Sequence, residues 1–193
     1  MSNKIQVFDL SNASNVSLTS NGFKKEGESA KYVCKITDAT IVFVGDNSKF
    51  ETDKKKLFNT FSITLPKEQS EEFKRILDET KRDSRSYSEY EGEIQFKVKL
   101  SPSTKIVNND KKPIKIDLRN VPCTDLREYK DATIDIVVTG TSNEFEGKNG
   151  DTRGNEVAPG EGKASPRLFS YISLTATQIK IKSMNSVFDC DFL

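Results

Sequence analysis

Aromatic side chains on the polar faces of predicted strands are the residues of this chain best suited to binding a ligand. Alternation places Phe169 and Tyr171 on a face shared with serines and threonines, and Phe58 on a similar face further upstream. Phe145 stands at the entrance to a long glycine-rich segment. Core packing does not explain rings in such positions, whereas stacking on unpaired nucleobases does. We therefore predict these four as stacking residues. The alternative is that they pack beneath a helix or the N-terminal segment.

Basic side chains recur on the outward faces of two consecutive predicted strands. Lys97 and Lys99 lie on the first strand, and Lys115 and Arg119 on the second. Although the net charge of the chain is only +1, the stretch from Glu93 to Arg119 has seven bases and three acids. Such a local positive footprint suits phosphate groups, and chance clustering is the alternative. Bases in predicted loops extend the set: Lys105, Lys111, Lys112, Arg153, Lys163 and Arg167.

Catalytic and metal chemistry find little support in the residue types present. The chain has no histidine, which excludes Ser-His-Asp and Cys-His catalysis and any zinc site built on histidine. Its three cysteines (Cys34, Cys123 and Cys190) are far apart and unpaired in spacing, as expected in a reducing compartment. We find no signal peptide and no transmembrane stretch. We therefore expect no catalytic residues, no metal, no cofactor and no membrane association, and a cytoplasmic location.

Period-two alternation of apolar residues predicts most of the elements that must position these side chains. The predicted strands cover residues 31–44, 57–65, 93–100, 113–118, 132–139 and 170–182, the last of which changes phase before Ile179. A phase change inside a strand is typical of a bulge or a barrel corner. Residues 67–82 alone have helical spacing, with Phe73, Ile76 and Leu77 on one face. Phe61, Phe73 and Phe96 are predicted core residues.

The order of elements predicts a mostly β (α+β) fold. We expect a five-stranded barrel with one covering amphipathic helix and extra N-terminal strands. Residues 1–29 form an irregular arm with one short strand around 17–19, residues 30–182 form the barrel, and residues 183–193 form a short acidic tail. Within the barrel, residues 146–166 hold five of the ten glycines and no apolar periodicity. This predicts a long flexible loop.

The order of these features resembles that of the single-stranded DNA-binding proteins of podophage replisomes. The resemblance covers roughly two-thirds of the chain and consists of strands and spacings. The matching stretches are Phe61-Ser-Ile-Thr-Leu-Pro, the helix Phe73-Lys-Arg-Ile-Leu-Asp-Glu, Tyr90-Glu-Gly, Phe96-Lys-Val-Lys, Ile114-Lys-Ile-Asp-Leu, Ala132-Thr-Ile-Asp-Ile-Val-Val and Tyr171-Ile-Ser-Leu-Thr-Ala-Thr-Gln-Ile.

The resemblance implies an oligonucleotide/oligosaccharide-binding barrel that holds single strands on an open face. That family also has a long acidic C-terminal tail, ending in an aromatic residue, that recruits polymerase and helicase. The present chain ends with Asp189, Asp191 and Phe192, followed by one leucine, in a far shorter segment. A polymerase or helicase contact through this tail is thus one interpretation, and a frayed end is the other.

Three functional classes follow from these residues and patterns. The first is a non-enzymatic, sequence-tolerant coat of single-stranded DNA in phage replication or recombination, with RNA as an alternative ligand and a homodimer left open. The second is a protein-interaction module, such as a virion component or an inhibitor of a host enzyme, which the near-zero net charge favours. The third is an enzyme, which only exposed carboxylates support.

Overall fold

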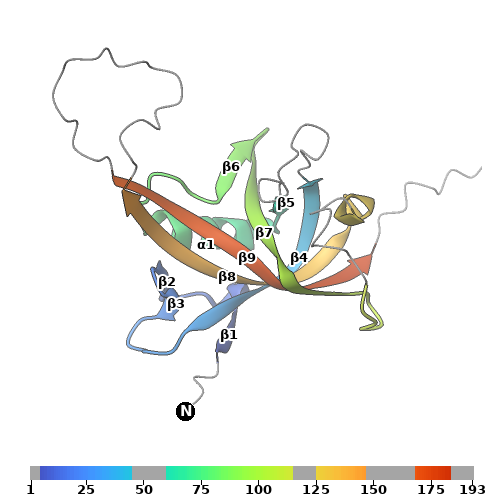
Figure 1. Cartoon of the computed structure of the whole chain (residues 1–193), viewed down its shortest axis with the longest axis horizontal. Coiled ribbons are helices and arrows are strands. Elements are labelled where there is room, and N and C mark those ends of the chain that lie inside the picture. The colour runs from blue at the N-terminus through green and yellow to red at the C-terminus, as the bar shows by residue number, and fades with distance from the viewer. Residues whose placement is uncertain (1–4, 45–59, 115–124, 147–167, 184–193) are drawn as a thin grey trace, which may run out of the picture.

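The computed structural model describes residues 5–44, 60–114, 125–146 and 168–183 (Figure 1). Within these residues the chain folds mostly into β-strands, with one α-helix and two 3₁₀ helices. In chain order the elements are β1 (Gln6–Asp9), η1 (Leu10–Asn12), β2 (Val16–Thr19), β3 (Gly22–Lys25), β4 (Tyr32–Val44), β5 (Thr60–Thr64), α1 (Lys67–Asp78), β6 (Tyr87–Tyr90), β7 (Glu93–Val107), η3 (Asp125–Tyr129), β8 (Thr133–Glu146) and β9 (Leu168–Ser183).

Five of the strands close into a ring. β4 pairs with β5, β5 with β7, β7 with β9 and β9 with β8, and β8 returns to β4. The β7–β9 pair is parallel and the other four pairs are antiparallel, so the sheet is mixed. Closure gives each of these strands a neighbour on both sides. The sequence predicts a ring of this size with one helix beside it.

Alternate side chains of the ring fill its interior. On β8, Ile134, Ile136 and Val138 are buried, whereas the residues between them are partly exposed. β7 follows the same rule as far as Leu100, whereas on β5 Ser62 is buried together with its neighbours Phe61 and Ile63. The predicted core residues Phe61 and Phe96 are buried on these strands. The other strands and the helix complete the core with these buried residues: Cys34, Ile36, Ile41, Ile63, Phe73, Ile76, Leu77, Val98, Leu100, Ile172, Leu174, Ala176, Ile179 and Ile181.

The N-terminal residues add three short strands outside the ring, where the sequence pattern predicts one. β1 runs parallel to β4, and β2 and β3 form a hairpin that pairs with β4 through Phe23 and Tyr32. The Phe23 ring is fully buried against Phe8, at 5.4 Å between ring centroids. These strands are only four residues long and partly polar, which explains why alternation does not reveal them.

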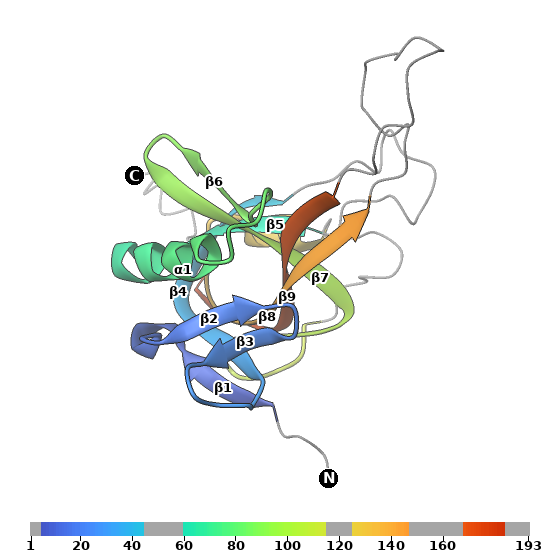
Figure 2. The same cartoon turned by 90° about the vertical axis from the view of Figure 1, so that its left-hand side faces the viewer.

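The helix α1 lies between the β6–β7 hairpin and the β2–β3 hairpin (Figure 2). It follows Pro66 and buries Ser70, Phe73, Ile76 and Leu77, as its helical spacing predicts. Phe73 contacts both neighbours of the helix, because its ring centroid lies 6.2 Å from that of Phe23 and 5.1 Å from that of Phe96. The helix therefore joins the N-terminal strands to the ring.

A bulge in β9 explains the change of phase in the last strand. Val137 of β8 pairs with Gln178 and Val138 pairs with Ala176, so Thr177 is an extra residue. The extra residue lets Ala176 and Ile179 both point inward although they are three positions apart. The prediction of an irregularity at this point is confirmed.

Several strands are longer than the sequence pattern suggests. β7 continues to Val107 past a register shift between Leu100 and Lys105, and β8 continues to Glu146. β6 is not predicted at all. It forms because Glu91 and Gly92 both have positive φ (51° and 83°), the conformation of a two-residue hairpin turn. Most of the strand predicted at 113–118 and residues 57–59 of the strand predicted at 57–65 lie outside the described residues.

Replacement of Gly140 by alanine tests the contact between the N-terminal hairpin and β8. A Cβ at Gly140 would lie 2.7 Å from the Phe23 ring and 3.0 Å from Leu18. We expect a loss of about 1–3 kcal/mol of unfolding free energy, the usual cost of overpacking. A denaturant titration measures it.

A double-mutant cycle with Phe23→Leu provides the control. Because leucine is shorter than phenylalanine, the double variant should lose less stability than the sum of the two single variants. Strict additivity would contradict a direct contact between position 140 and the Phe23 ring.

Candidate nucleic-acid interface

The outward face of the β8–β9 hairpin carries a row of polar residues that ends in aromatic rings. Across the two strands, Thr141 lies opposite Ser173, Asn143 opposite Tyr171, and Phe145 opposite Phe169. Because successive side chains of a strand point to opposite sides, all six belong to one face. The sequence prediction that Phe169 and Tyr171 share a face with serines and threonines agrees with this register, which adds Phe145 to the same face.

The three rings contact one another, and we call them the aromatic end. Phe145 stacks on Phe169 with 5.4 Å between centroids and 19° between planes. Tyr171 meets the same Phe145 ring edge to face at 5.8 Å. Phe145 is 51% exposed, and Phe169 and Tyr171 are partly exposed. A cluster of rings with accessible faces can stack on planar ligands.

The segment that follows α1 holds the aromatic end in place. The Arg82 guanidinium binds the carboxylate of Glu144, the residue before Phe145, and lies 3.5 Å from the Ser142 hydroxyl. The Asp83 carboxylate accepts hydrogen bonds from the Ser170 amide at 3.2 Å and from the Ser170 hydroxyl at 2.9 Å.

Backbone bonds extend the same attachment along β9. The Ser84 amide donates to the Ser170 carbonyl at 3.1 Å, and the Ser84 carbonyl accepts from the Ile172 amide at 2.9 Å. The Ser86 hydroxyl donates to the Ile172 carbonyl at 2.6 Å, and the Lys97 amide donates to the Ser86 carbonyl at 2.8 Å. Residues 84–86 therefore fill the space between β7 and β9 and fix both strands.

Lys97 and Lys99 continue the outward face onto β7. Lys97 lies opposite Ser62 of β5, and Lys99 lies opposite both Thr60 of β5 and Thr175 of β9. Both lysines are exposed. No carboxylate among the described residues lies within 4.0 Å of either ammonium group. Their charge is thus available to an anion.

The bases around α1 contrast with these lysines, because acids neutralise them locally. Lys74 lies 2.8 Å from Asp78, Arg85 lies 2.9 Å from the same carboxylate, and Arg75 binds Glu72 and Glu79. Burial raises the pKa of Asp78, but hydrogen bonds from Lys74 and Tyr87 and the two nearby positive charges outweigh it. The pKa of Asp78 therefore lies below its usual value, and the carboxylate stays charged.

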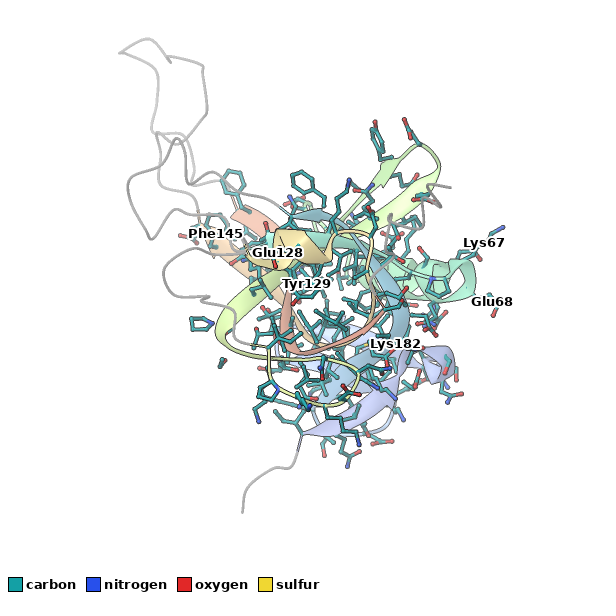
Figure 3. The ribbon with its side chains drawn as sticks, turned by 90° about the vertical axis from the view of Figure 1, so that its right-hand side faces the viewer. Lys67, Glu68, Glu128, Tyr129, Phe145 and Lys182 are labelled. Carbon is teal, nitrogen blue, oxygen red and sulfur yellow. The ribbon has the colours of Figure 1, made fainter. Side chains whose placement is uncertain are left out.

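A cleft between α1 and the N-terminal residues is acidic. It has a volume of about 1200 Å³ and lies between residues 10–17 and the helix. Four glutamates line it with only Lys67 and Arg75 as bases: Glu26, Glu68, Glu72 and Glu79. Figure 3 shows Lys67 and Glu68 on the opposite side of the molecule from Phe145. The cleft is a poor site for phosphate and is separate from the aromatic end.

Of the other predicted binding residues, Lys111 and Lys112 lie away from the aromatic end, and a second group lies outside the described residues. Lys111 and Lys112 are exposed in the turn after β7, closed by Asn108, and Figure 1 places the end of β7 far from the start of β9. The predicted residues outside the described part of the chain are Phe58, Lys115, Arg119, Arg153, Lys163, Arg167, Asp189, Asp191 and Phe192.

Phe43 is an exposed aromatic residue that the sequence pattern does not single out. It is 60% exposed on β4 and lies opposite Ser62. In the sequence it sits between Val42 and Val44, so the run is typical of a buried strand. Only a register shift between Ile41 and Phe43 turns its ring outward. The pattern contains no signal of that shift.

Within the described residues, no group of three or more cysteine, aspartate or glutamate side chains is arranged to hold a metal ion. The same part of the chain contains no helix with the length and apolar character needed to cross a membrane.

Comparison with known proteins finds similar structures but no similar sequences. No protein-family model matches the chain, and no curated protein matches it. Among solved structures, it is similar to the single-stranded DNA-binding protein from bacteriophage Enc34, at 12% identity and a TM-score of 0.48, over 92% of this chain and 95% of that one.

Two further structures of that phage protein are also similar. The complex with single-stranded DNA has 9% identity and a TM-score of 0.47, over 84% of this chain and 90% of that one. The C-terminal truncation has 10% identity and a TM-score of 0.46, over 85% and 91%. At such values we assign no residue role from these structures, and they do not single out the podophage type.

Removal of the Asp83 carboxylate tests how the aromatic end is held. In Asp83→Ala we expect faster amide hydrogen exchange at Ser170 and a stability loss of about 1 kcal/mol, because two hydrogen bonds disappear. NMR-detected exchange measures this at single residues. Asp110→Ala, in the turn after β7, should leave the exchange of Ser170 unchanged. Equal protection of Ser170 in Asp83→Ala and the wild type would contradict the attachment.

Proposed function

We propose that this chain is a non-enzymatic protein that binds single-stranded DNA on the outward face of its ring. The observation that carries the proposal is the aromatic end on the same sheet as two exposed lysines, neither of which pairs with a carboxylate among the described residues; Lys99 lies opposite Thr175, four residues along β9 from Tyr171. Stacked rings accept any base, because every base has a π-face, and lysines accept any phosphate. Binding of this kind tolerates any sequence.

We infer that the ring is an oligonucleotide/oligosaccharide-binding barrel. In that fold a five-stranded barrel binds oligonucleotides on the face of its second and third strands and with the loops after its first and fourth strands. Here the second and third ring strands in chain order are β5 and β7, and β7 carries Lys97 and Lys99. In chain order, the segments that join the first ring strand to the second and the fourth to the fifth are residues 45–59 and 147–167, which contain the predicted residues Phe58, Arg153, Lys163 and Arg167.

The biological setting that we propose is the coating of DNA during phage replication or recombination, in the host cytoplasm. The podophage type of protein and the recruitment of a polymerase or helicase through Asp189, Asp191 and Phe192 belong to the same proposal. RNA binding and a homodimer stay open. Each of these depends on single-strand binding, which is therefore the first property to measure.

Salt dependence tests the role of the lysines. Fluorescence anisotropy of labelled oligo-dT should show binding that weakens with salt, with a slope of about −0.7 per phosphate contact. Lys97→Gln/Lys99→Gln should flatten the log–log slope by about 1.4, since two contacts are lost. Duplex DNA serves as the competitor control. An unchanged slope would mean that these lysines do not meet phosphates.

Alanine substitutions test the role of the rings. Phe145→Ala and Tyr171→Ala should each weaken oligo-dT binding by about 5- to 100-fold, the equivalent of about 1–3 kcal/mol per stacked base. Tyr90→Ala is the matched control, because Tyr90 is 61% exposed but lies among Glu89, Glu91 and Glu93, which repel phosphates.

The outcomes separate the proposal from its alternative. If Phe145→Ala and Tyr171→Ala bind oligo-dT as tightly as the control Tyr90→Ala, bases do not stack on the aromatic end. No binding of oligo-dT by the wild type at low salt would remove the whole proposal. The exposed rings would then point to a protein-interaction module, the second functional class that the sequence allows.

A further inference from the structure

Phe43 is an exposed ring on the outside of β4, a different ring strand from those that carry the aromatic end. It is 60% exposed, and no ring contact involves it among the described residues. A phenylalanine in a strand ordinarily gains stability by burial. An exposed one on a protein surface is informative when its surroundings suit a ligand.

The bulge in β4 determines the direction of this ring. Ile41 pairs with Ile63, Phe43 with Ser62, and Val44 with Phe61, so β4 has one residue more than β5 at this point. Ile41 and Val44 remain buried on either side. Phe43 thus shares the outward face with Ser62, and a bulge of this kind commonly re-aims a side chain near a binding site.

A row of small hydroxyl side chains and one lysine connects Phe43 with the aromatic end. Ser62 lies opposite Phe43 on one side and opposite Lys97 on the other. The Lys97 amide donates a hydrogen bond to the Ser86 carbonyl, and the Ser86 hydroxyl donates one to the carbonyl of Ile172 on β9. Ser173 is the next residue of β9. We call this sequence the hydroxyl row: Ser62, Lys97, Ser86, Ser173 and, opposite Ser173 on β8, Thr141.

Most of the hydroxyl row is accessible to a polynucleotide backbone, because Lys97 is exposed and Ser86, Ser173 and Thr141 are partly exposed, whereas Ser62 is only 9% exposed. It contains no carboxylate and no large apolar side chain, and hydroxyl and ammonium groups are common partners of phosphate oxygens. From β4 to β9 the row crosses about four strand spacings, or roughly 20 Å, and the aromatic end begins two residues further along β9. At about 3.4 Å per stacked nucleotide this distance takes about six nucleotides, and fewer when the strand is extended.

We propose that Phe43 is a second base-stacking subsite, and that a single strand of DNA crosses the hydroxyl row between Phe43 and the aromatic end. The inference rests on the proposed function and adds to it a route and a minimum length. Unpaired nucleobases stack at both ends of the route. Lys97 and Lys99 meet the phosphates between them.

A tryptophan in place of Phe43 gives a direct signal of stacking. The chain contains no tryptophan, so Phe43→Trp introduces a single indole at an exposed position that tolerates its size. On titration with dT16 we expect quenching of the indole fluorescence that follows the anisotropy of the same complex. Tyr90→Trp is the control, and its fluorescence should change little. Binding by anisotropy without quenching in Phe43→Trp would overturn the inference and leave the proposed function intact.

Oligonucleotide length gives the second readout. With dT16, Phe43→Ala should bind about 5- to 20-fold more weakly than the wild type, because one stacked base is lost. With dT3, which is too short to reach both ends, the loss should be under about twofold, because the oligomer uses the intact aromatic end. Phe43→Tyr, which keeps the ring, should restore binding to dT16.

The possible results separate the two proposals. An equal affinity of Phe43→Ala and the wild type for dT16, while Phe145→Ala is weakened, would overturn the second subsite alone. Absence of binding by every form, including the wild type, would overturn the proposed function. Circular dichroism of each variant establishes that it is folded before binding is compared.

Discussion

The interior of the five-stranded ring is filled by its own side chains. Because of this packing, a ligand can contact only the outer surface of the ring. Inward residues such as Phe61, Phe96 and Ile136 are completely buried. A barrel of five strands has no space for a ligand once such residues occupy it. Because side chains alternate, each buried residue is flanked by outward ones, and the spacing of the core thereby sets the spacing of the surface rows. The arrangement of the proposed binding face is a consequence of the core.

Two bulges set the details of that face, and they explain which parts of it the sequence predicts. Periodicity predicts the helix, the main strands and the shared face of Phe169 and Tyr171, because these depend only on a period of 3.6 or two residues. The extra residue in β9 is also visible, since Ala176 and Ile179 are both apolar. The bulge before Phe43 is hidden, because its neighbours Val42 and Val44 are apolar whichever way they point.

Local sequence patterns do not predict which strands pair when they are far apart in the chain. The parallel β7–β9 contact and the return of β8 to β4 join segments far apart in the chain. They place Lys99 opposite Thr175 of β9, the strand that carries Phe169 and Tyr171, whereas Lys111 and Lys112 lie in the turn after β7, although these lysines belong to the same basic stretch of sequence. The sequence also does not predict ion pairs. A lysine of α1 and a lysine of β7 differ only in the carboxylates that the fold brings close to them.

The distribution of charge on the surface indicates which side chains would supply the affinity of the proposed binding. Carboxylates pair with Lys74 and Arg75 of α1, whereas Lys97 and Lys99 of β7 pair with no carboxylate among the described residues. The net charge of +1 does not reveal this difference. Two lysines release few counterions, whereas three clustered rings and Phe43 offer stacking of about 1–3 kcal/mol per base. The rings would then supply most of the affinity of the described face, and the lysines its preference for a polyanion. An interface built in this way needs no strongly basic protein.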